Sequence, residues 1–430
     1  MRYVSTRDNS KEYSFEDVFI KGLADDGGLY VPTSLKKFSL NELSELKNLN
    51  YNDLSTEIIN QFSSDFISKD DLSSLIKKSY STFREKEVVK ISNIGDLKLL
   101  ELFHGPTLAF KDVAMQFIGN LYEYYLSKND KKINIVVATS GDTGAAAIDA
   151  IKGKSNLNIF VLHPNNRISP VQRKLMTTVE DENVFNIAID GNFDDCQNIV
   201  KQMFSDLDFS KSINMSGVNS INWARIIAQA VYYFYTYFKL NVDKPISFSV
   251  PTGNFGDVFA GYLAKQMGLP IDKLIVATNE NDILHRAISN GDYVSKKVKE
   301  TLSPSMDIQL ASNFERLIYY INNSNSEKTA EIMKKVKQNS YQIEKNNLDI
   351  IQKDFLSESC NEQETLDIIK KNYEENNIIL DPHTAVGVGA AKKLSFNDCV
   401  VLSTAHPCKF PDATNNAINK YEKLPKELQH

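Results

Sequence analysis

The sequence is poor in the residues that mark secreted and metal-binding proteins. Only four of its 430 residues are cysteines. No two of them form a CxxC pair, so neither a disulfide framework nor a zinc ribbon is predicted. His406 and Cys408 lie close together, but two ligands without a second pair leave the coordination sphere of a metal unfilled. We therefore expect reduced, buried cysteines and no metal site.

Long apolar runs and an excess of positive charge are also absent. No stretch approaches the roughly 18 apolar residues of a membrane-spanning helix, and the first residues contain no apolar core of a signal peptide. The formal net charge is −6, whereas nucleic acids and anionic membranes select for clustered lysine and arginine. We expect a soluble, cytoplasmic protein that binds neither nucleic acid nor membrane.

The length and the apolar content predict several packed units. With 430 residues, of which 42% are hydrophobic, the chain is longer than one ordinary domain needs. Residues 1–95 contain helical patterns and a capping box from Ser14 to Asp17, which predict a mainly helical N-terminal unit.

From residue 96 on, short apolar runs alternate with helical stretches, as in parallel βα units. The predicted strands span residues 97–102, 133–138, 158–162, 246–250, 273–277 and 399–402. We therefore predict an α/β fold in which two parallel-sheet domains, 96–240 and 241–430, follow the helical unit.

Lys111 is the first candidate for chemistry. It lies among apolar and uncharged neighbours in the segment 104–112, at the start of a stripe of helical period. An ammonium in a dry pocket has its charged form destabilised, so its pKa falls and the amine becomes a nucleophile. Pyridoxal phosphate, an aldehyde, is the obvious cofactor for such an amine. The alternative is a lysine at a helix edge whose ammonium reaches water.

A glycine-containing turn follows the strand at 246–250. Gly253 and Gly256 lie in the segment 251–257, which opens a helix. Backbone N–H groups that converge there, together with the helix dipole, make a seat for a phosphate. The alternative is an ordinary turn between strand and helix.

Two other nucleotide motifs are incomplete. Gly153-Lys-Ser155 resembles the end of a Walker A loop, but Ile148 stands where the leading glycine belongs. Gly387-Val-Gly389 lacks the third glycine of a dinucleotide fingerprint, because Lys392 occupies that position. Neither ATP nor NAD is predicted.

The segment 139–144 follows another predicted strand and precedes a run of alanines. The hydroxyls of Ser140 and Thr143, with free N–H groups at the helix start, would hold an anionic substrate group such as a carboxylate. The alternative is that these side chains only cap the helix.

A third segment, Asn219–Arg225, adds two amides and a guanidinium. Arginine presents a rigid fork that matches phosphate or carboxylate oxygens, so Arg225 is our candidate for a charged substrate tail. The alternative is a surface salt bridge. Near the C-terminus, a predicted strand ends in Ser403–Pro407, which places hydroxyls at the carboxyl end of a strand, where α/β sheets bind ligands.

Together these segments resemble the threonine synthase family of pyridoxal-phosphate enzymes, of fold type II and similar to the tryptophan synthase β chain. The similarity extends over nearly the whole chain, and residues 1–95 resemble the extra domain of the family's longer form. It rests on the motifs Tyr3–Arg7, Gly27–Pro32, Phe103–Asp112, Ser140–Gly144, Asn219–Asn222, Gly253–Gly256, Ser303–Ile308, Ser312–Arg316, Asp381–Ala385 and Ser403–Pro407.

The resemblance implies a role for each site residue. Lys111 would be the Schiff-base lysine, and Thr404 would hydrogen-bond the pyridine nitrogen. The cofactor phosphate would bind at Gly253, Asn254, Phe255, Gly256 and Asp257. The substrate would be held by Ser140, Asp142, Thr143, Asn222 and Arg225.

The implied reaction is the conversion of O-phospho-L-homoserine to L-threonine and phosphate, by a monomer or homodimer. The main rival is another enzyme of the same class, such as a serine/threonine dehydratase or a cysteine synthase. It would use Lys111 in the same way but act on a neutral or smaller leaving group, whereas Arg225 favours a phosphorylated substrate. A second rival is a relative that keeps the cofactor but only binds or regulates.

Overall fold

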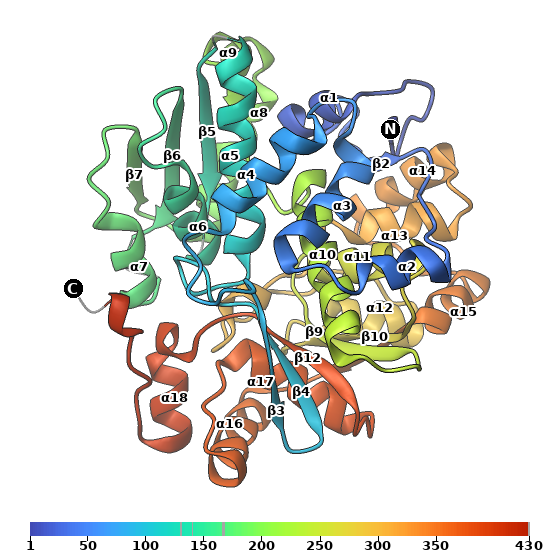
Figure 1. The fold of residues 1–430 in the computed structure, drawn as a ribbon, viewed down its shortest axis with the longest axis vertical. Helices are drawn as coiled ribbons and strands as arrows, with labels where there is room; N and C mark the ends of the chain where they lie inside the picture. Colours follow the sequence, from blue (N-terminus) through green and yellow to red (C-terminus); the bar gives the residue numbers. More distant parts are fainter. Residues whose placement is uncertain (130, 140, 166–167, 429–430) are drawn as a thin grey trace.

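Two larger sheets and a mainly helical N-terminal unit, which contains a two-stranded sheet of its own, make up the described part of the protein (Figure 1). The computed structural model describes residues 1–129, 131–139, 141–165 and 168–428. The larger sheet has the strand order β11-β10-β9-β12-β4-β3, and all its neighbours are parallel except β3 and β4. Its strands are β3 (Lys90–Ile94), β4 (Leu97–Glu101), β9 (Ile246–Pro251), β10 (Ile271–Thr278), β11 (Phe355–Ser359) and β12 (Cys399–Ser403).

The smaller sheet is parallel throughout and has the order β7-β6-β5-β8. Its strands are β5 (Ile133–Ala138), β6 (Leu157–Pro164), β7 (Val184–Ile189) and β8 (Met215–Ser216). The predicted α/β class is thus confirmed, as are all six predicted strands. Strands β3, β7, β8 and β11 were not predicted.

One strand lies in a different sheet from the one that the sequence division implies. β4 opens the predicted domain 96–240, yet it pairs with β12 in the six-stranded sheet, with Leu99 opposite Val401. An apolar run predicts that a segment forms a strand, but it does not predict which other strand the segment pairs with. The domain limits themselves stay a prediction.

The N-terminal unit is mainly helical in the structure. β1 (Tyr3–Ser5) pairs antiparallel with β2 (Tyr30–Pro32), and the Ser14 capping box opens α1 as predicted. Arg7 forms an ion pair of 2.7 Å with Glu315, which ties this unit to helix α13 (Phe314–Ile321). Its helices are α1 (Phe15–Lys21), α2 (Leu40–Leu46), α3 (Tyr51–Ser63) and α4 (Lys69–Tyr80).

The remaining helices pack around the sheets. Those that follow β4 and precede β9 are α5 (Lys111–Asn129), α6 (Asp142–Ile151), α7 (Pro170–Thr177), α8 (Phe193–Ser205), α9 (Leu207–Ser212) and α10 (Trp223–Leu240). Those that follow β9 are α11 (Gly256–Gln266), α12 (Ile283–Asn290), α13 (Phe314–Ile321), α14 (Ser326–Lys337), α15 (Lys345–Asp354), α16 (Glu362–Asn376), α17 (Pro382–Lys393) and α18 (Pro411–Ile418), with the 3₁₀ turns η1 (Pro304–Met306), η2 (Pro407–Lys409) and η3 (Lys426–Leu428).

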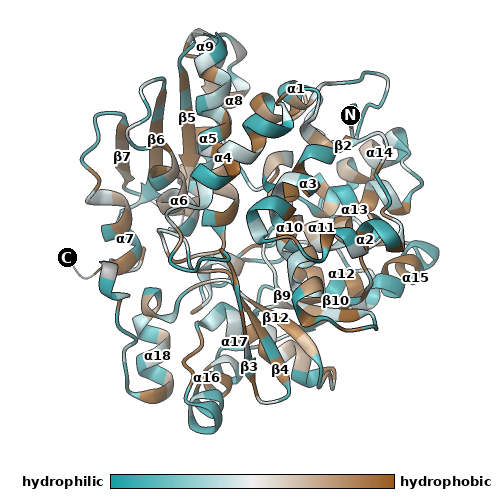
Figure 2. Ribbon diagram, in the orientation of Figure 1, coloured by the Kyte–Doolittle hydropathy of each residue, from teal (hydrophilic) through white to brown (hydrophobic). Residues whose placement is uncertain are grey.

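The core follows from the apolar pattern of these elements. Every residue of β9 is buried, as expected of a parallel strand covered on both faces. Figure 2 shows mostly hydrophobic residues, in brown, along β5 and β6 of the smaller sheet. α10 is apolar on nearly all sides and packs against α3, α5 and α11, so it is a central helix rather than a surface one. No helix in the described ranges is long and apolar enough to cross a bilayer.

The fold brings the predicted site segments together at strand ends. β5 leads into α6, β9 leads into α11, and β12 leads into the segment that contains Thr404. In parallel sheets the carboxyl ends of the strands meet at one edge, which is where ligands bind.

Candidate active site

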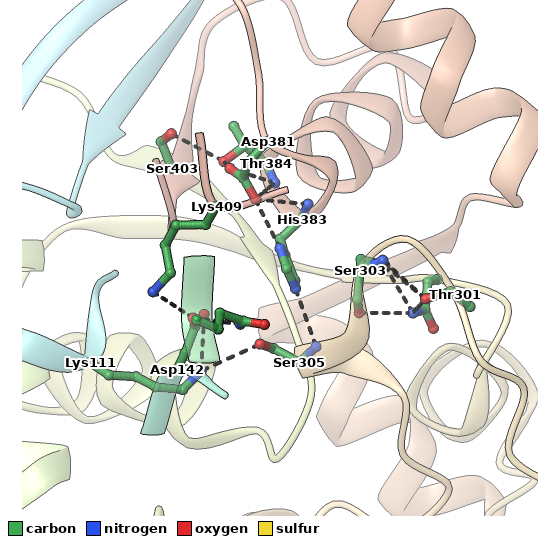
Figure 3. A network of polar contacts seen from close by, with 12 residues as sticks. Lys111, Asp142, Thr301, Ser303, Ser305, Asp381, His383, Thr384, Ser403 and Lys409 are labelled. Carbon is green, nitrogen blue, oxygen red and sulfur yellow. Dashed lines mark hydrogen bonds and ion pairs between the residues drawn. The ribbon is translucent and has the colours of Figure 1, made fainter. Parts of the chain in front are cut away.

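Lys111 lies at the meeting point of both sheets. It opens α5, and the N–H group of the preceding residue, Phe110, donates to the carbonyl of Thr404 at 2.8 Å. The Lys111 Nζ lies 3.5 Å from the Ser305 Oγ and 3.8 Å from a carboxylate oxygen of Asp142 (Figure 3). The side chain is 11% exposed, so it does not reach into water from a helix edge.

The surroundings of Lys111 favour the neutral amine. Burial lowers its pKa to about 8, an effect that Asp142 opposes and that Arg225 and Lys409 reinforce. A pKa of about 8 leaves an appreciable neutral fraction near neutral pH, and the neutral form is the nucleophile. This is the behaviour predicted for a lysine that reacts with an aldehyde.

Asp142 is an ionised carboxylate among cations. Burial would raise its pKa, but Lys409 and Lys111 outweigh burial and hold the pKa well below its usual range. The Lys409 Nζ lies 2.6 Å from Asp142 Oδ1, and the Gln172 amide donates to the same oxygen at 2.8 Å.

The start of α6 leaves backbone donors without a side-chain cap. Gly141 is the N-cap residue, and it has no side chain with which to cap α6. The hydroxyl of Thr139 instead accepts from the N–H groups of Gly141, at 3.0 Å, and Gly144, at 2.9 Å. Thr143 lies in the first turn and does not cap it, while Ser140 lies outside the described residues. The first turn of α6 therefore suits an anion.

The predicted phosphate loop lies beside Lys111. A Cβ added to Gly253 would lie 2.6 Å from the carbonyl oxygen of Ser305, the residue whose hydroxyl faces Lys111. Phe255, in the left-handed region with a φ of 63°, precedes α11, which also has no side-chain cap. The carbonyl of Asn254 accepts from the backbone and side-chain amides of Asn313, both at 3.1 Å. These bonds anchor the loop, and the N-cap residue of α11 provides no side-chain cap.

Asp257 turns its side chain away from this loop. Its Oδ1 accepts hydrogen bonds from the hydroxyls of Tyr232 and of Tyr233, the latter at 3.0 Å. Its Oδ2 is buried and has no hydrogen-bond partner in the described part of the chain. Burial raises the pKa of Asp257 to about 7, against the effect of the two hydroxyls.

Arg225 is a buried cation that has no counterion among the residues that the structure describes. It is 3% exposed, and one of its nitrogens donates to the Val218 carbonyl at 3.1 Å. Among described residues its Nε has no hydrogen-bond partner, and no carboxylate offsets the burial that lowers its pKa to about 10. It is therefore not the surface salt bridge that we considered. A guanidinium of this kind fits an anionic ligand.

Asn222, in contrast, is occupied by the fold. Its side-chain amide donates to the carbonyl of Phe19 at 2.9 Å, and its oxygen caps α10 by accepting from the Ala224 N–H at 3.0 Å. Both groups are used without any ligand, so Asn222 reaches a substrate only if one of these bonds is replaced.

Four further residues of the site had no role in the sequence prediction. Ser305 and Lys409 contact Lys111 and Asp142 directly. His383 Nε2 accepts from the Ser305 N–H at 3.2 Å, which places the ring proton on Nδ1, 2.9 Å from Asp381 (Figure 3). Ser305, Asp381 and His383 lie within family motifs named above, so the motifs could have marked them as site residues. Lys409 lies in none of these motifs, and no motif predicts which side chains come into contact.

The residues present fit pyridoxal phosphate. The site combines the buried amine of Lys111, a close backbone approach at Gly253, helix starts whose N-cap residues provide no side-chain cap, and the Arg225 guanidinium, which meets no carboxylate among the described residues. Fold and site together define a pyridoxal-phosphate-dependent enzyme of fold type II.

Comparisons with known proteins narrow this class. Three family models match, "Threonine synthase N terminus" over residues 2–80, "Pyridoxal-phosphate dependent enzyme" over 97–336 and "Threonine synthase, C-terminal" over 384–430. The threonine synthase of Saccharomyces cerevisiae is 47% identical, across 99% of this chain and 92% of its own. That of Pseudomonas aeruginosa is 45% identical, across 100% and 93%.

Solved structures of similar proteins belong to the same family. The crystal structure of pyridoxal-phosphate-bound threonine synthase from Brucella melitensis has a TM-score of 0.96 and 44% identity, and the match covers 100% of this chain and 93% of that one. The chain belongs to the threonine synthase family. The family, fold type and cofactor predicted from the motifs are confirmed.

Proposed function

We propose that this protein converts O-phospho-L-homoserine and water to L-threonine and inorganic phosphate. The full-length similarity to proteins named threonine synthase carries the proposal. The site supports it, because Arg225 is a buried cation suited to a phosphorylated or carboxylated substrate.

Three parts of the chain would hold the cofactor. Lys111 would bind its aldehyde carbon, the N–H groups of residues 253–257 its phosphate, and Thr404 its pyridine nitrogen. When bound, pyridoxal phosphate supplies an electron sink for negative charge at the α carbon of the substrate.

Lys111 is the acid and base of the reaction in this proposal. With the substrate bound, the free Lys111 Nζ would lie beside the α and β carbons of the substrate and would move protons at both. A pKa of about 8 suits this work, because a group that both takes and gives protons acts best near the working pH.

The charged ends of the substrate would be held by the other candidate residues. Arg225 would bind one anionic group, and the start of α6 with Thr143 would bind the other through N–H and hydroxyl donors. The bond from the γ carbon to the phosphate oxygen would break and phosphate would leave. The β carbon would lose one proton and gain the hydroxyl of water, and the γ carbon would gain a proton, so that one water is consumed for each phosphate released.

An assay with two substrates tests this function. The holoenzyme is mixed with O-phospho-L-homoserine and, separately, with L-serine, and phosphate, threonine and pyruvate are measured. We expect equal amounts of phosphate and threonine from the first. Pyruvate from serine without phosphate release would instead indicate a dehydratase, and no product from either would indicate a binding protein.

Two variants separate the proposed roles. Lys111→Ala should lose turnover with every substrate. Arg225→Met should lower kcat/KM for the phosphorylated substrate by roughly a hundredfold, from the loss of charge-assisted bonds in a buried site. Arg225→Lys, which keeps the charge, is the matched control. Normal turnover in Lys111→Ala would contradict the mechanism.

We also propose that the protein acts in the cytoplasm, as a monomer or homodimer. Its four cysteines are free thiols, which supports a reducing compartment. Light scattering of the purified holoenzyme measures the oligomeric state.

A further inference from the structure

Lys409 is a fully buried lysine beside the site that has no part in the reaction steps above. It ends η2, and its side chain is 0% exposed. Its Nζ lies 2.6 Å from Asp142 Oδ1 and donates to the Thr107 carbonyl at 2.7 Å. A buried ammonium is costly unless it is paired and hydrogen-bonded, and both conditions are met here.

The two oxygens of Asp142 face different cations. Oδ1 accepts from Lys409 and from Gln172, whereas Oδ2 faces Lys111 at 3.8 Å (Figure 3). The close ion pair is therefore the one with Lys409, and the contact with Lys111 is a loose one. Because two donors hold Oδ1, the carboxylate cannot turn freely toward Lys111.

Lys409 also joins separate segments of the fold. It follows β12 of the six-stranded sheet, while Asp142 opens α6 beside the four-stranded sheet. The Lys409 carbonyl accepts from the hydroxyl of Ser169, the N-cap residue of α7, at 3.1 Å. The orientation of Asp142 is thus set from the opposite side of the site.

Four charged groups act on Lys111. Asp142 and Asp112 favour its charged form, and Arg225 and Lys409 oppose it. If Lys409 were removed, the charge of Asp142 would be balanced by Lys111 alone. A full ion pair between Asp142 and Lys111 would then hold the amine protonated.

We propose that Lys409 is a positioning residue that acts through Asp142: it holds this carboxylate in its own ion pair and so leaves the Lys111 amine available to the cofactor. This inference rests on the proposed function of Lys111 as the lysine that bonds the cofactor.

The test is the pH dependence of cofactor capture by the full-length apoprotein. Pyridoxal phosphate is added between pH 6 and 10, and the capture rate is followed by absorbance. The unchanged protein should show a midpoint near its Lys111 pKa of about 8. In Lys409→Met we expect the midpoint to rise by about one pH unit, which makes capture at pH 7 about tenfold slower. Lys409→Arg, which keeps the charge, should retain the original midpoint.

A second variant tests the same idea from the other partner. Asp142→Asn removes the group that favours a charged Lys111, so its midpoint should fall, and the double variant Asp142→Asn with Lys409→Met should not show the upward shift. If Lys409→Met fails to fold, Asp142→Asn alone decides.

Two results would overturn the inference in different ways. An unchanged midpoint in folded Lys409→Met, or in Asp142→Asn, means that Lys409 is only structural. Borohydride reduction that places the cofactor on a lysine other than Lys111 removes the proposed function itself. An adduct on Lys111 without the shift overturns only the role of Lys409.

Discussion

The helices α6 and α11 begin alike but differ in the aspartate of their first turn. Both follow a parallel strand, both lack a side-chain cap, and both carry a buried aspartate. Asp142 in α6 is ionised between Lys409 and Lys111. Asp257 in α11 meets only the hydroxyls of Tyr232 and Tyr233, and burial raises its pKa to about 7.

This difference shows two ways to keep a helix start open to an anion. A free carboxylate in the first turn would repel a phosphate or carboxylate ligand and offset the helix dipole. In α6 the charge of the aspartate is cancelled by lysines that also belong to the site. In α11 burial disfavours the charge itself, so the N–H groups of residues 253–257 keep their full effect.

The largest expected effect is on the free energy of unfolding when Asp257 in the first turn of α11 is replaced. Asp257→Asn should stabilise the apoprotein at pH 8, because the pKa of Asp257 is raised in the folded state. The folded protein binds the proton of Asp257 more tightly than the unfolded chain does. The contribution of the protonated carboxyl to stability is therefore fully present below the unfolded pKa of about 4 and is lost as pH rises through the folded pKa of about 7. Urea unfolding should show a gain over the unchanged protein that grows from near zero at pH 4 to roughly 4 kcal/mol at pH 8.

The control for this prediction is the other aspartate. Asp142→Asn should show no such gain at pH 8, since the unchanged carboxylate is stabilised by two lysines. Equal behaviour of the two variants would break the comparison.

An intermediate effect is expected at Gly253. A Cβ would lie 2.6 Å from the backbone oxygen of Ser305, so Gly253→Ala must shift one of two backbones. We expect a cost of about 1–3 kcal/mol, seen as a roughly ten- to hundredfold weaker affinity for pyridoxal phosphate in a fluorescence titration of the apoprotein.

Gly256→Ala is the matched control. The atom nearest to its Cβ would be the side-chain amide of Asn313 at 3.3 Å, and the backbone oxygen of Ser220 would lie at 3.6 Å, an ordinary contact distance. If both variants bound the cofactor equally well, the close approach at Gly253 would have no part in binding.

The smallest expected effect is the loss of stability when the hydroxyl of Thr139 is removed from the start of α6. Thr139→Val removes the hydroxyl that accepts from the N–H groups of Gly141 and Gly144 and keeps the shape of the side chain. Thermal and urea unfolding should show a loss of about 1–2 kcal/mol. Thr177→Val, on the exposed surface of α7, is the control and should change stability by less than about 0.5 kcal/mol. A loss of equal size in both would contradict the role of Thr139.

Sequence patterns predicted the segments of the site better than its contacts. The glycine turn at 253–256 and the capping box at Ser14 are local signals, and the structure has the expected backbone at both. The side chains of Asn222 and Asp257 could not be placed in this way. Their partners, Phe19 and the tyrosines of α10, depend on how distant helices pack.

The sequence by itself predicted six strands, the capping box at Ser14 and the family, because periodicity, caps and motifs are properties of continuous segments. The tertiary structure alone decided that Lys409 meets Asp142 and that Arg225 has no counterion within the described residues. Charges shift a pKa only when they are near each other and shielded from water, and both conditions arise from packing between segments far apart in the chain.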